Sequence, residues 1–354
     1  MSLASTSSPR PSAKFLSLLA GGVALASSSA YAAPPAPSYP PAAAPAQTAP
    51  PTVPIGVDFL PYAGTSSALP HARRVVSLNV VGGLAGGLDA FELGGAFNLH
   101  SGLVRGLEIA GALNVVDGPV HGGQLAGALN LATDELVGLQ LGALDLAIGP
   151  VTGAQIGAVN IAGGDVRGAQ IGTVNIADGD VHGTQIGVVN IAATADAGIG
   201  LVNVYWDGWA EADLAVSETS LALVGVRHGS SALYNVYYAG TRLDRPSELS
   251  VGFGIGGRWL LNRHLELSFD VTTISTAIDG RFSRLHAQVA LRPQIAWRIA
   301  DTFALWAGPT LNVLTTEYHD EDLGLPASAV RLSDRGADTQ VWMWPGFAAG
   351  VRIF

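Results

Sequence analysis

Two patterns of hydrophobic and polar positions divide the body of this chain. Between residues 91 and 204, aliphatic residues recur at every fifth position inside a longer repeat of 15 or 16 residues, and residues 154–162 return with few changes at 169–177 and 184–192. Beyond residue 205, apolar and polar residues alternate one by one. A short tandem period is typical of a solenoid, whereas a period of two indicates amphipathic strands.

The five-residue spacing predicts how each repeat folds. In a strand, residues i and i−2 point to one face and residue i−1 to the other. We therefore expect the aliphatic residue of each unit to face inward, the Gln, Asn or Asp before it to face outward, and Gly or Ala to turn the corners of a three-sided coil. The predicted core positions, one per coil, are Leu93, Ile109, Leu125, Leu141, Ile156, Ile171, Ile186 and Ile199. The predicted outer polar positions are Gln155, Asn160, Asp165, Gln170, Asn175, Asp180, Gln185 and Asn190.

An antiparallel meander with one strand per repeat, as in a membrane barrel, is the alternative for this segment. Two observations favour the solenoid. Three early copies carry one extra residue at the same place in the repeat, which in a solenoid stacks at one corner. Strict alternation across residues 154–162 leaves neither face apolar enough for lipid. We predict an all-β protein with a β-solenoid of about eight coils over 91–204, a single continuous outer-membrane-type β-barrel being the alternative.

The alternating segment, residues 205–354, predicts an antiparallel β-barrel or barrel-like sheet. Leu249, Val251 and Phe253 alternate with Ser250 and Gly252, and similar runs of about ten residues recur between polar turns. All seven tryptophans lie in this segment. The chain ends on Phe354, which fits the C-terminal assembly signal of an outer-membrane barrel. A soluble barrel or sandwich with a dry apolar core is the alternative.

The N-terminal segments predict export. Residues 1–32 carry two positive charges, then an apolar run, then the small residues that precede a cleavage site, which is the order found in a signal peptide. Residues 33–54 contain nine prolines among 22 residues, and we expect a disordered Pro/Ala-rich linker there. We assign residues 55–90 to entry strands or a cap before the repeats.

Composition excludes several classes of protein. The 354-residue chain has no cysteine, so disulfide scaffolds, thiolate metal sites, cysteine nucleophiles and cysteine-linked lipid anchors are excluded. Its net charge of −10 becomes −12 when the two positive charges of the signal peptide are removed. An acidic chain lacks the basic face that binds nucleic acid, so we expect no nucleic-acid partner.

Candidate chemistry is sparse. No phosphate loop, nucleophile elbow or zinc-protease motif occurs, and the eight histidines lack the spacing of metal ligands. The charged residues Glu317, His319, Asp320, Glu321 and Asp322 predict a polar surface loop, with binding of a ligand or weak binding of a divalent cation as the functional hypotheses. We expect no catalytic residue, no cofactor and no metal site.

The repeat motif GxQIGxVNIA resembles the surface-repeat-containing proteins first described among spirochaetes. Residues 76–80 (VSLNV), 234–237 (YNVY) and 308–313 (GPTLNV) extend the similarity, which covers roughly residues 74–354. The resemblance implies a location in the cell envelope and no established enzymatic chemistry. Anchoring by lipid, which some members use, does not carry over because this chain has no cysteine.

These observations predict a non-enzymatic protein of a Gram-negative envelope. We expect it at the outer membrane or cell surface, with the periplasm as the alternative location. Its expected role is structural or adhesive, with the outer membrane and an unidentified protein or surface ligand as partners. An outer-membrane pore or transport barrel is the alternative function.

Overall fold

A computed structural model describes residues 50–230, 232–278, 282, 284–318, 323–334 and 339–354. Strands make up about 70% of the described residues, which contain no α-helix, and this confirms the predicted all-β class. No helix in these ranges is long and apolar enough to cross a membrane. The predicted signal peptide and residues 33–49 of the predicted linker lie outside the described residues.

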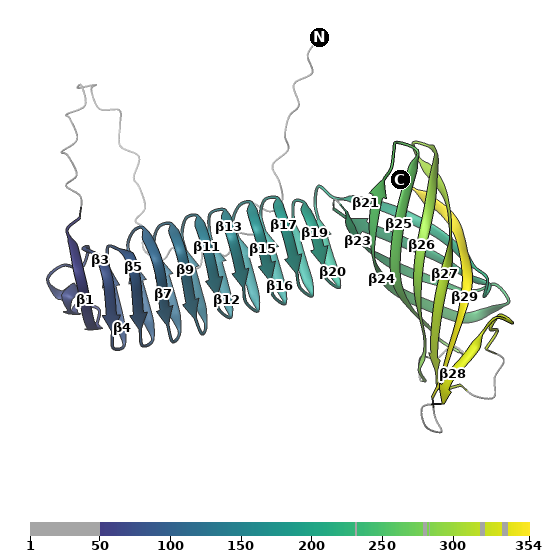
Figure 1. Ribbon diagram of the computed structural model, residues 1–354, viewed down its shortest axis with the longest axis horizontal. Coiled ribbons are helices and arrows are strands. Elements are labelled where there is room, and N and C mark those ends of the chain that lie inside the picture. The colour runs from purple at the N-terminus through teal and green to yellow at the C-terminus, as the bar shows by residue number, and fades with distance from the viewer. Residues whose placement is uncertain (1–49, 231, 279–281, 283, 319–322, 335–338) are drawn as a thin grey trace, which may run out of the picture. The chain divides into compact units, whose positions relative to one another are not determined.

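Two parallel sheets form a β-solenoid of about nine turns, as Figure 1 shows. One sheet contains the long strands β1 (Thr52–Leu60), β3 (Arg73–Asn79), β5 (Gly87–Gly94), β7 (Val104–Ala110), β9 (Val120–Ala126), β11 (Leu136–Leu141), β13 (Val151–Ile156), β15 (Val166–Ile171), β17 (Val181–Ile186) and β19 (Ala195–Ile199). The other contains the short strands β4 (Gly82–Ala85), β6 (Phe97–His100), β8 (Leu113–Val116), β10 (Leu129–Ala132), β12 (Leu144–Ala147), β14 (Val159–Ala162), β16 (Val174–Ala177), β18 (Val189–Ala192) and β20 (Val202–Tyr205). Before β3, the short strand β2 (Ala63–Gly64) pairs antiparallel with β1, and a 3₁₀ turn, η1 (Thr65–Ser67), follows.

The predicted solenoid is confirmed, with changes at its start and in its cross-section. Strands β3 and β4 add a coil inside the segment that we assigned to entry strands. Residues 52–54, which we assigned to the linker, begin β1. Strand β2 pairs only with Asp58 and Leu60 of β1, so Pro54 lies at the edge of the sheet and removes no ladder bond from a central strand. Each coil has two strands rather than three sides, because a turn replaces the third side.

The predicted inside and outside of the solenoid are wrong, because the two faces are exchanged. The Gln and Asn positions that we placed outside, Gln155 and Asn160 among them, are fully buried, whereas Leu93, Leu141 and Ile199 are 40–45% exposed. The inward side of each late coil consists of a Val, a Gln, an Asn and an Ala, such as Val151, Gln155, Asn160 and Ala162. Asp165 and Asp180 lie at the turns and are half-buried.

Hydrogen bonds between coils account for the buried amides. Gly153 adopts a positive φ of 131°, and a Cβ there would lie 2.0 Å from the carbonyl oxygen of Gly138 in the preceding coil. Successive coils therefore approach closely, and only glycine fits at this position. Amide side chains are flat, and their polar groups can bond to the same group one coil away, so they are buried without an unpaired N–H.

Eight antiparallel strands close into a β-barrel after the solenoid (Figure 1). These strands are β21 (Trp209–Ser217), β22 (Leu221–Gly229), β23 (Leu233–Arg242), β24 (Arg245–Leu260), β25 (Leu265–Thr276), β26 (His286–Ala300), β27 (Phe303–Thr316) and β29 (Gln340–Ile353). The short strand β28 (Val330–Asp334) pairs with β29. Pairing of β21 with β29, in which Leu214 lies opposite Val351, closes the barrel.

The barrel is apolar outside, and its interior holds charged and polar side chains together with a small buried apolar cluster that includes Leu223, Ile274 and Trp306. The predicted alternation holds, since Leu249 and Val251 face outward and Ser250 between them is buried. The larger outward apolar side chains form what we call the apolar band: Leu214, Val216, Val224, Val226, Leu249, Val251, Leu267, Phe269, Val271, Val289, Leu291, Ile295, Leu305 and Leu311. A soluble barrel with a dry apolar core, the alternative that we left open, has the opposite polarity.

The chain divides into two compact units near residues 157–166, and the last coils belong to the same unit as the barrel. The last coil contacts the barrel through hydrogen bonds. The amide of Ala195 donates to the Ser230 hydroxyl over 2.7 Å, and the Tyr237 hydroxyl donates to the carbonyl of Leu201 over 2.8 Å.

Candidate functional site

A column of buried asparagines lies along the short sheet. The Nδ2 of Asn98 donates to Oδ1 of Asn114 over 3.0 Å, Asn114 donates to Asn130 over 3.0 Å, and Asn130 donates to Asp145 over 2.8 Å. The second N–H of Asn98 donates to the carbonyl of Ile109, which lies across the corner on β7. Asn98 therefore links neighbouring coils and also the two sheets, and Asn114 does the same through the carbonyl of Leu125.

A second column, of glutamines, lies along the long sheet and donates in the opposite direction. The Nε2 of Gln155 donates to Gln140 and that of Gln140 to Gln124, both over 2.8 Å. The column ends where Gln124 donates to Oε2 of Glu108 over 3.0 Å. Because a carboxylate only accepts hydrogen bonds, Glu108 stops the row of donors.

Asp145 is an acid in the asparagine column. One carboxylate oxygen accepts from Asn130, whereas Oδ2 is buried and has no hydrogen-bond partner. Burial raises the pKa of Asp145 to about 6, although the hydrogen bond from Asn130 acts against it.

Glu92, His100 and Glu108 form a buried cluster that we call the acidic triad. His100 Nε2 lies 2.5 Å from Oε2 of Glu92 and 2.9 Å from Oε1 of Glu108, and all three side chains are at most 1% exposed. Burial by itself lowers the pKa of His100, but the two carboxylates outweigh it and raise that pKa to about 10. One atom from each residue lies within 4.8 Å of the others, which is the spacing of metal ligands.

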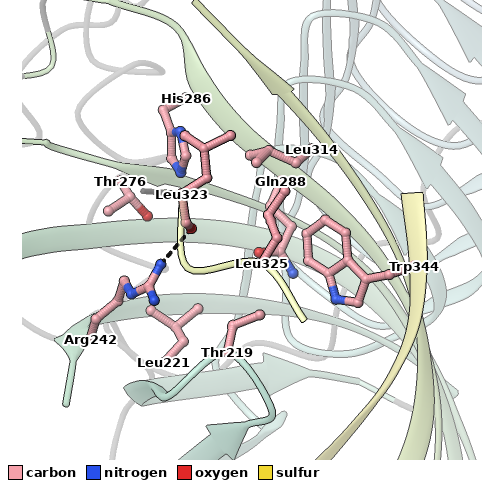
Figure 2. A pocket seen from close by; sticks show the side chains of 10 residues that line it. All are labelled: Thr219, Leu221, Arg242, Thr276, His286, Gln288, Leu314, Leu323, Leu325 and Trp344. Carbon is pink, nitrogen blue, oxygen red and sulfur yellow. Dashed lines mark hydrogen bonds between the residues drawn. The ribbon is translucent and has the colours of Figure 1, made fainter. Parts of the chain in front are cut away.

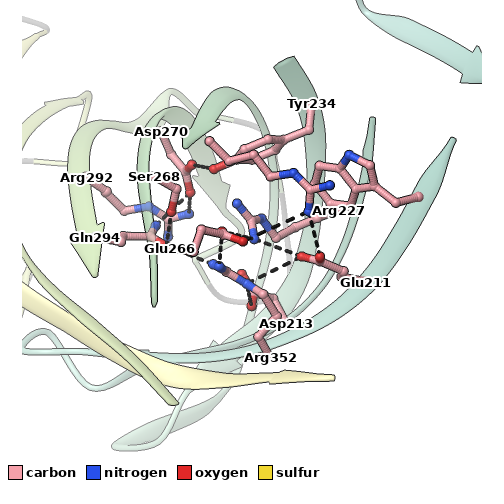
Figure 3. Close-up of polar contacts among 12 residues, drawn as sticks. Glu211, Asp213, Arg227, Tyr234, Glu266, Ser268, Asp270, Arg292, Gln294 and Arg352 are labelled. Atoms are coloured by element: carbon pink, nitrogen blue, oxygen red, sulfur yellow. Dashed lines mark hydrogen bonds and ion pairs between the residues drawn. The ribbon is translucent and has the colours of Figure 1, made fainter. Parts of the chain in front are cut away.

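The barrel lumen holds a charged cluster that we call the lumen network, shown in Figure 3. Its four guanidinium groups belong to Arg227, Arg258, Arg292 and Arg352. Its four carboxylates belong to Glu211, Asp213, Glu266 and Asp270. Four positive and four negative groups balance, so the lumen network is neutral as a whole.

Strands far apart in the sequence supply the partners in this network. The Nη1 of Arg352 on β29 lies 2.7 Å from Glu266 on β25, and its Nε lies 3.2 Å from Asp213 on β21. Arg227 lies over the ring of Tyr234, 3.9 Å from its centre. The network therefore ties the two closing strands to the middle of the barrel (Figure 3).

The other end of the lumen is closed by a segment that follows β27. Leu323 and Leu325 line a small pocket with Trp344 and His286, and Arg242 donates to the carbonyl of Leu323 over 2.9 Å (Figure 2). The cavity is about 20 Å³, enough for about one water molecule. Among the described residues, side chains fill the lumen at this point.

The predicted surface loop lies mostly outside the described residues, since His319, Asp320, Glu321 and Asp322 are not among them. Of its predicted residues, Glu317 is described, and it accepts a hydrogen bond from the amide of Leu285 over 3.1 Å. Phe354 has the guanidinium of Arg298 over its ring at 3.9 Å, and its amide donates to Thr302. A role for Phe354 in assembly stays a prediction.

Sequence reasoning missed the acidic triad and the lumen network. Glu92 and Glu108 occupy the glutamine column, and His100 occupies the position of Ala85 and Val116 in neighbouring coils. The sequence signal of the acidic triad is the presence of charged residues at positions where other coils have amide or apolar residues. This signal can be recognised only when those positions are known to be buried. The lumen network has no local signal, because its partners are separated by up to 139 residues.

Comparison of the chain with protein-family models, with curated proteins and with solved structures finds no match. The resemblance to surface-repeat-containing proteins therefore stays a prediction.

Proposed function

We propose that this protein is an integral outer-membrane β-barrel that anchors a β-solenoid scaffold, with a structural or interaction role in the envelope rather than an enzymatic one. The observation that carries the proposal is the polarity of the barrel. Its outside is apolar, and its inside holds the buried, charge-balanced lumen network. This is the polarity of barrels that sit in lipid, where outward residues contact hydrocarbon.

The energetics of the apolar band support insertion into a bilayer. Transfer of one large apolar side chain from water into an apolar phase contributes about 1.5–3 kcal/mol. The fourteen outward side chains of the band are each 37–60% exposed, so together they favour lipid over water by an amount on the order of 10 kcal/mol or more. Trp259 and Trp297, 58% and 62% exposed, lie at one rim, where an aromatic girdle is expected.

The lumen network supports an anchor over a pore. Water-filled porins have 16 or more strands, whereas an eight-stranded barrel is just wide enough for its own side chains. Here the side chains form ion pairs across the lumen, and the two described lumen cavities are about 20 Å³ each. A pore or transport barrel, the alternative function, would require this network to open.

Barrel topology supports a periplasmic position for the solenoid. The chain enters the barrel at β21, at the same end of the barrel as its C-terminus. This end also carries three short connections, 230–232, 261–264 and 301–302, of three, four and two residues. The opposite end carries the longer connections 277–285 and 317–329. Outer-membrane barrels have short periplasmic turns and longer extracellular loops. The solenoid of the anchored protein would then face the periplasm rather than the cell surface.

Membrane extraction tests the anchor. The mature chain is expected in the outer-membrane fraction, resistant to alkaline carbonate and urea, and released only by detergent. In planar bilayers it is expected to show no stable conductance. A chain that is freely soluble in the periplasm contradicts the anchor, and steady single-channel currents support the pore instead.

Cysteine labelling tests the orientation, because the chain has no cysteine of its own. Thr152→Cys places a thiol on the exposed side of the solenoid, and Ala327→Cys places one in the connection after β27, where Ala327 is exposed. With a membrane-impermeant maleimide and intact cells, only the Ala327→Cys variant is expected to react. The Thr152→Cys variant is expected to react after the outer membrane is permeabilised. Labelling of Thr152→Cys in intact cells reverses the orientation but leaves the anchor in place.

A further inference from the structure

We propose that the acidic triad is a binding site for one divalent transition-metal cation of the zinc type, held inside the second and third coils of the solenoid. The three candidate ligand atoms are Oε2 of Glu92 on β5, Nε2 of His100 on β6 and Oε1 of Glu108 on β7. They come from both sheets and from two successive coils. The cation would join these three strands from within.

The hydrogen bonds of the triad are incomplete without a cation. Histidine carries a single N–H at Nε2, and in the triad it is directed at Glu92, only 2.5 Å away. Oε1 of Glu108 lies 2.9 Å from the same nitrogen but is a buried atom that receives no hydrogen bond. Two carboxylate oxygens and one imidazole nitrogen therefore converge on a point where a single N–H can bond to only one of the oxygens. A cation at that point contacts all three.

The charge of the triad also favours a divalent cation. With His100 protonated, two carboxylates and one imidazolium leave a buried net charge of −1. Neutral imidazole, two carboxylates and a divalent cation sum to zero. Because an uncompensated buried charge is costly, exchange of the proton for the cation removes a charge imbalance.

The remaining oxygens of both carboxylates are held by amides that stand behind the triad. Asn79 donates to Oε1 of Glu92 over 2.7 Å, and Gln124 donates to Oε2 of Glu108 over 3.0 Å. Such outer contacts orient carboxylate ligands in metal sites and leave their other oxygens free to coordinate. The amide columns therefore present one oxygen of each glutamate to the same point.

The geometry needs only a small expansion. Zinc bonds to nitrogen and carboxylate oxygen are about 2.0–2.2 Å, which sets ligand atoms about 3.4 Å apart in a tetrahedron. The observed contacts to Nε2 are 2.5 and 2.9 Å. Side-chain rotations that open these contacts by less than about 1 Å meet the requirement. Because the triad is enclosed, the cation would be a structural one that is taken up as the coil folds.

Metal analysis of the mature protein tests the site. The full chain is produced in medium with added zinc, purified in detergent, dialysed against EDTA and analysed by plasma mass spectrometry. About one zinc per chain is expected. Glu108→Gln is expected to reduce the zinc content per chain at least tenfold. This variant is matched to the fold, because glutamine stands at the same position in the next coil, where Gln124 pairs in register with Glu108.

His121→Ala is the control for surface binding. His121 pairs with Glu135 over 2.9 Å outside the core, where both side chains are 39–47% exposed. The zinc content of the His121→Ala variant is therefore expected to equal that of the wild type.

X-ray absorption of the wild type, which needs no variant, is expected to show one imidazole and otherwise oxygen ligands. Wild-type protein without stoichiometric zinc, equal zinc in Glu108→Gln, loss of zinc in His121→Ala, or a first shell with two or more imidazoles each overturns the proposal. None of these outcomes changes the membrane anchor.

Discussion

The side chain of Asn203, in the last coil of the solenoid, donates a hydrogen bond to Oδ1 of Asn235 on barrel strand β23. Asn203 itself accepts from Asn190 over 2.6 Å, so the amide column of the solenoid continues to a residue of the barrel. Asn235 also donates to the carbonyl of Gly200 over 2.9 Å. One buried side chain thus terminates the column and binds the backbone of the last coil.

Asn235→Ala is expected to loosen the last coil. The change removes the acceptor of Asn203 and the donor to Gly200, and unpaired buried polar groups cost about 1–3 kcal/mol each. Hydrogen exchange of residues 195–205 should quicken by tenfold or more, while the barrel keeps its heat-resistant mobility in gels. Thr152→Ala, at an exposed position, is the control and should leave exchange unchanged. Unaltered exchange in Asn235→Ala would contradict a stabilising role for this junction.

Gln140 and Leu141 are neighbours that test the polarity of the coil. Gln140 is fully buried and bonded to Gln124 and Gln155, whereas Leu141 is 40% exposed. Gln140→Leu should destabilise the solenoid by about 2–4 kcal/mol, because it removes the acceptor of Gln155 and the donor to Gln124 inside the solenoid. Leu141→Ser should cost less than about 1 kcal/mol. Denaturant titration followed by far-ultraviolet circular dichroism measures both, and a larger loss for Leu141→Ser would reverse the assignment.

Asp145→Asn is expected to stabilise the solenoid at neutral pH. Burial raises the pKa of Asp145 in the folded state from 3.8 to about 6, so the folded state binds the proton more tightly than the unfolded state does. The native state is therefore penalised as pH rises from about 4 to about 6, and the penalty is fully present above that range. Asparagine carries no charge, so Asp145→Asn removes this penalty. The substitution fits the column, because the register partner of Asp145 in the preceding coil is Asn130.

Solenoid stability at pH 4 and pH 7.5 measures this effect. We expect Asp145→Asn to gain about 1–3 kcal/mol over the wild type at pH 7.5 and little at pH 4. Asp165→Asn, at a half-buried turn, is the comparison for a general loss of negative charge. An equal gain at both pH values would show that the charge of Asp145 is not the cause.

Arg352→Met is expected to impair the barrel. It leaves Asp213 and Glu266 without a buried partner on β29, and breaking a buried ion pair from one side costs about 3–5 kcal/mol. The fraction of chain that folds into detergent or lipid, read from heat-dependent gel mobility, should fall sharply. Ile353→Ala, one position along on the outer side and 44% exposed, should fold almost normally. Normal folding of Arg352→Met would show that β29 closes the barrel without the lumen network.

Local sequence pattern predicted the elements of this protein well. The period of 15 or 16 residues specified the coils, and one-by-one alternation specified amphipathic barrel strands, because both periods follow from the geometry of a single strand. The extra coil at β3 and β4 was missed because Ser77 and Gly83 stand at the positions where later coils carry Gln or Glu and Asn. Its interior residues are Arg74, Ser77 and Asn79, and the Nη2 of Arg74 is paired with Asp58 over 2.7 Å.

What faces inward was decided only by the tertiary structure. An isolated coil would bury isoleucine rather than glutamine, since a single buried amide is costly. Stacking changes the balance, because each amide meets an identical one in the next coil and both of its N–H groups are satisfied. The same holds in the barrel, where Arg352 meets Glu266 only after β21 and β29 have closed the sheet. The periodicity of the chain thus determined where strands form, and contacts between coils and across the lumen, which no local pattern records, determined which polar groups could be buried.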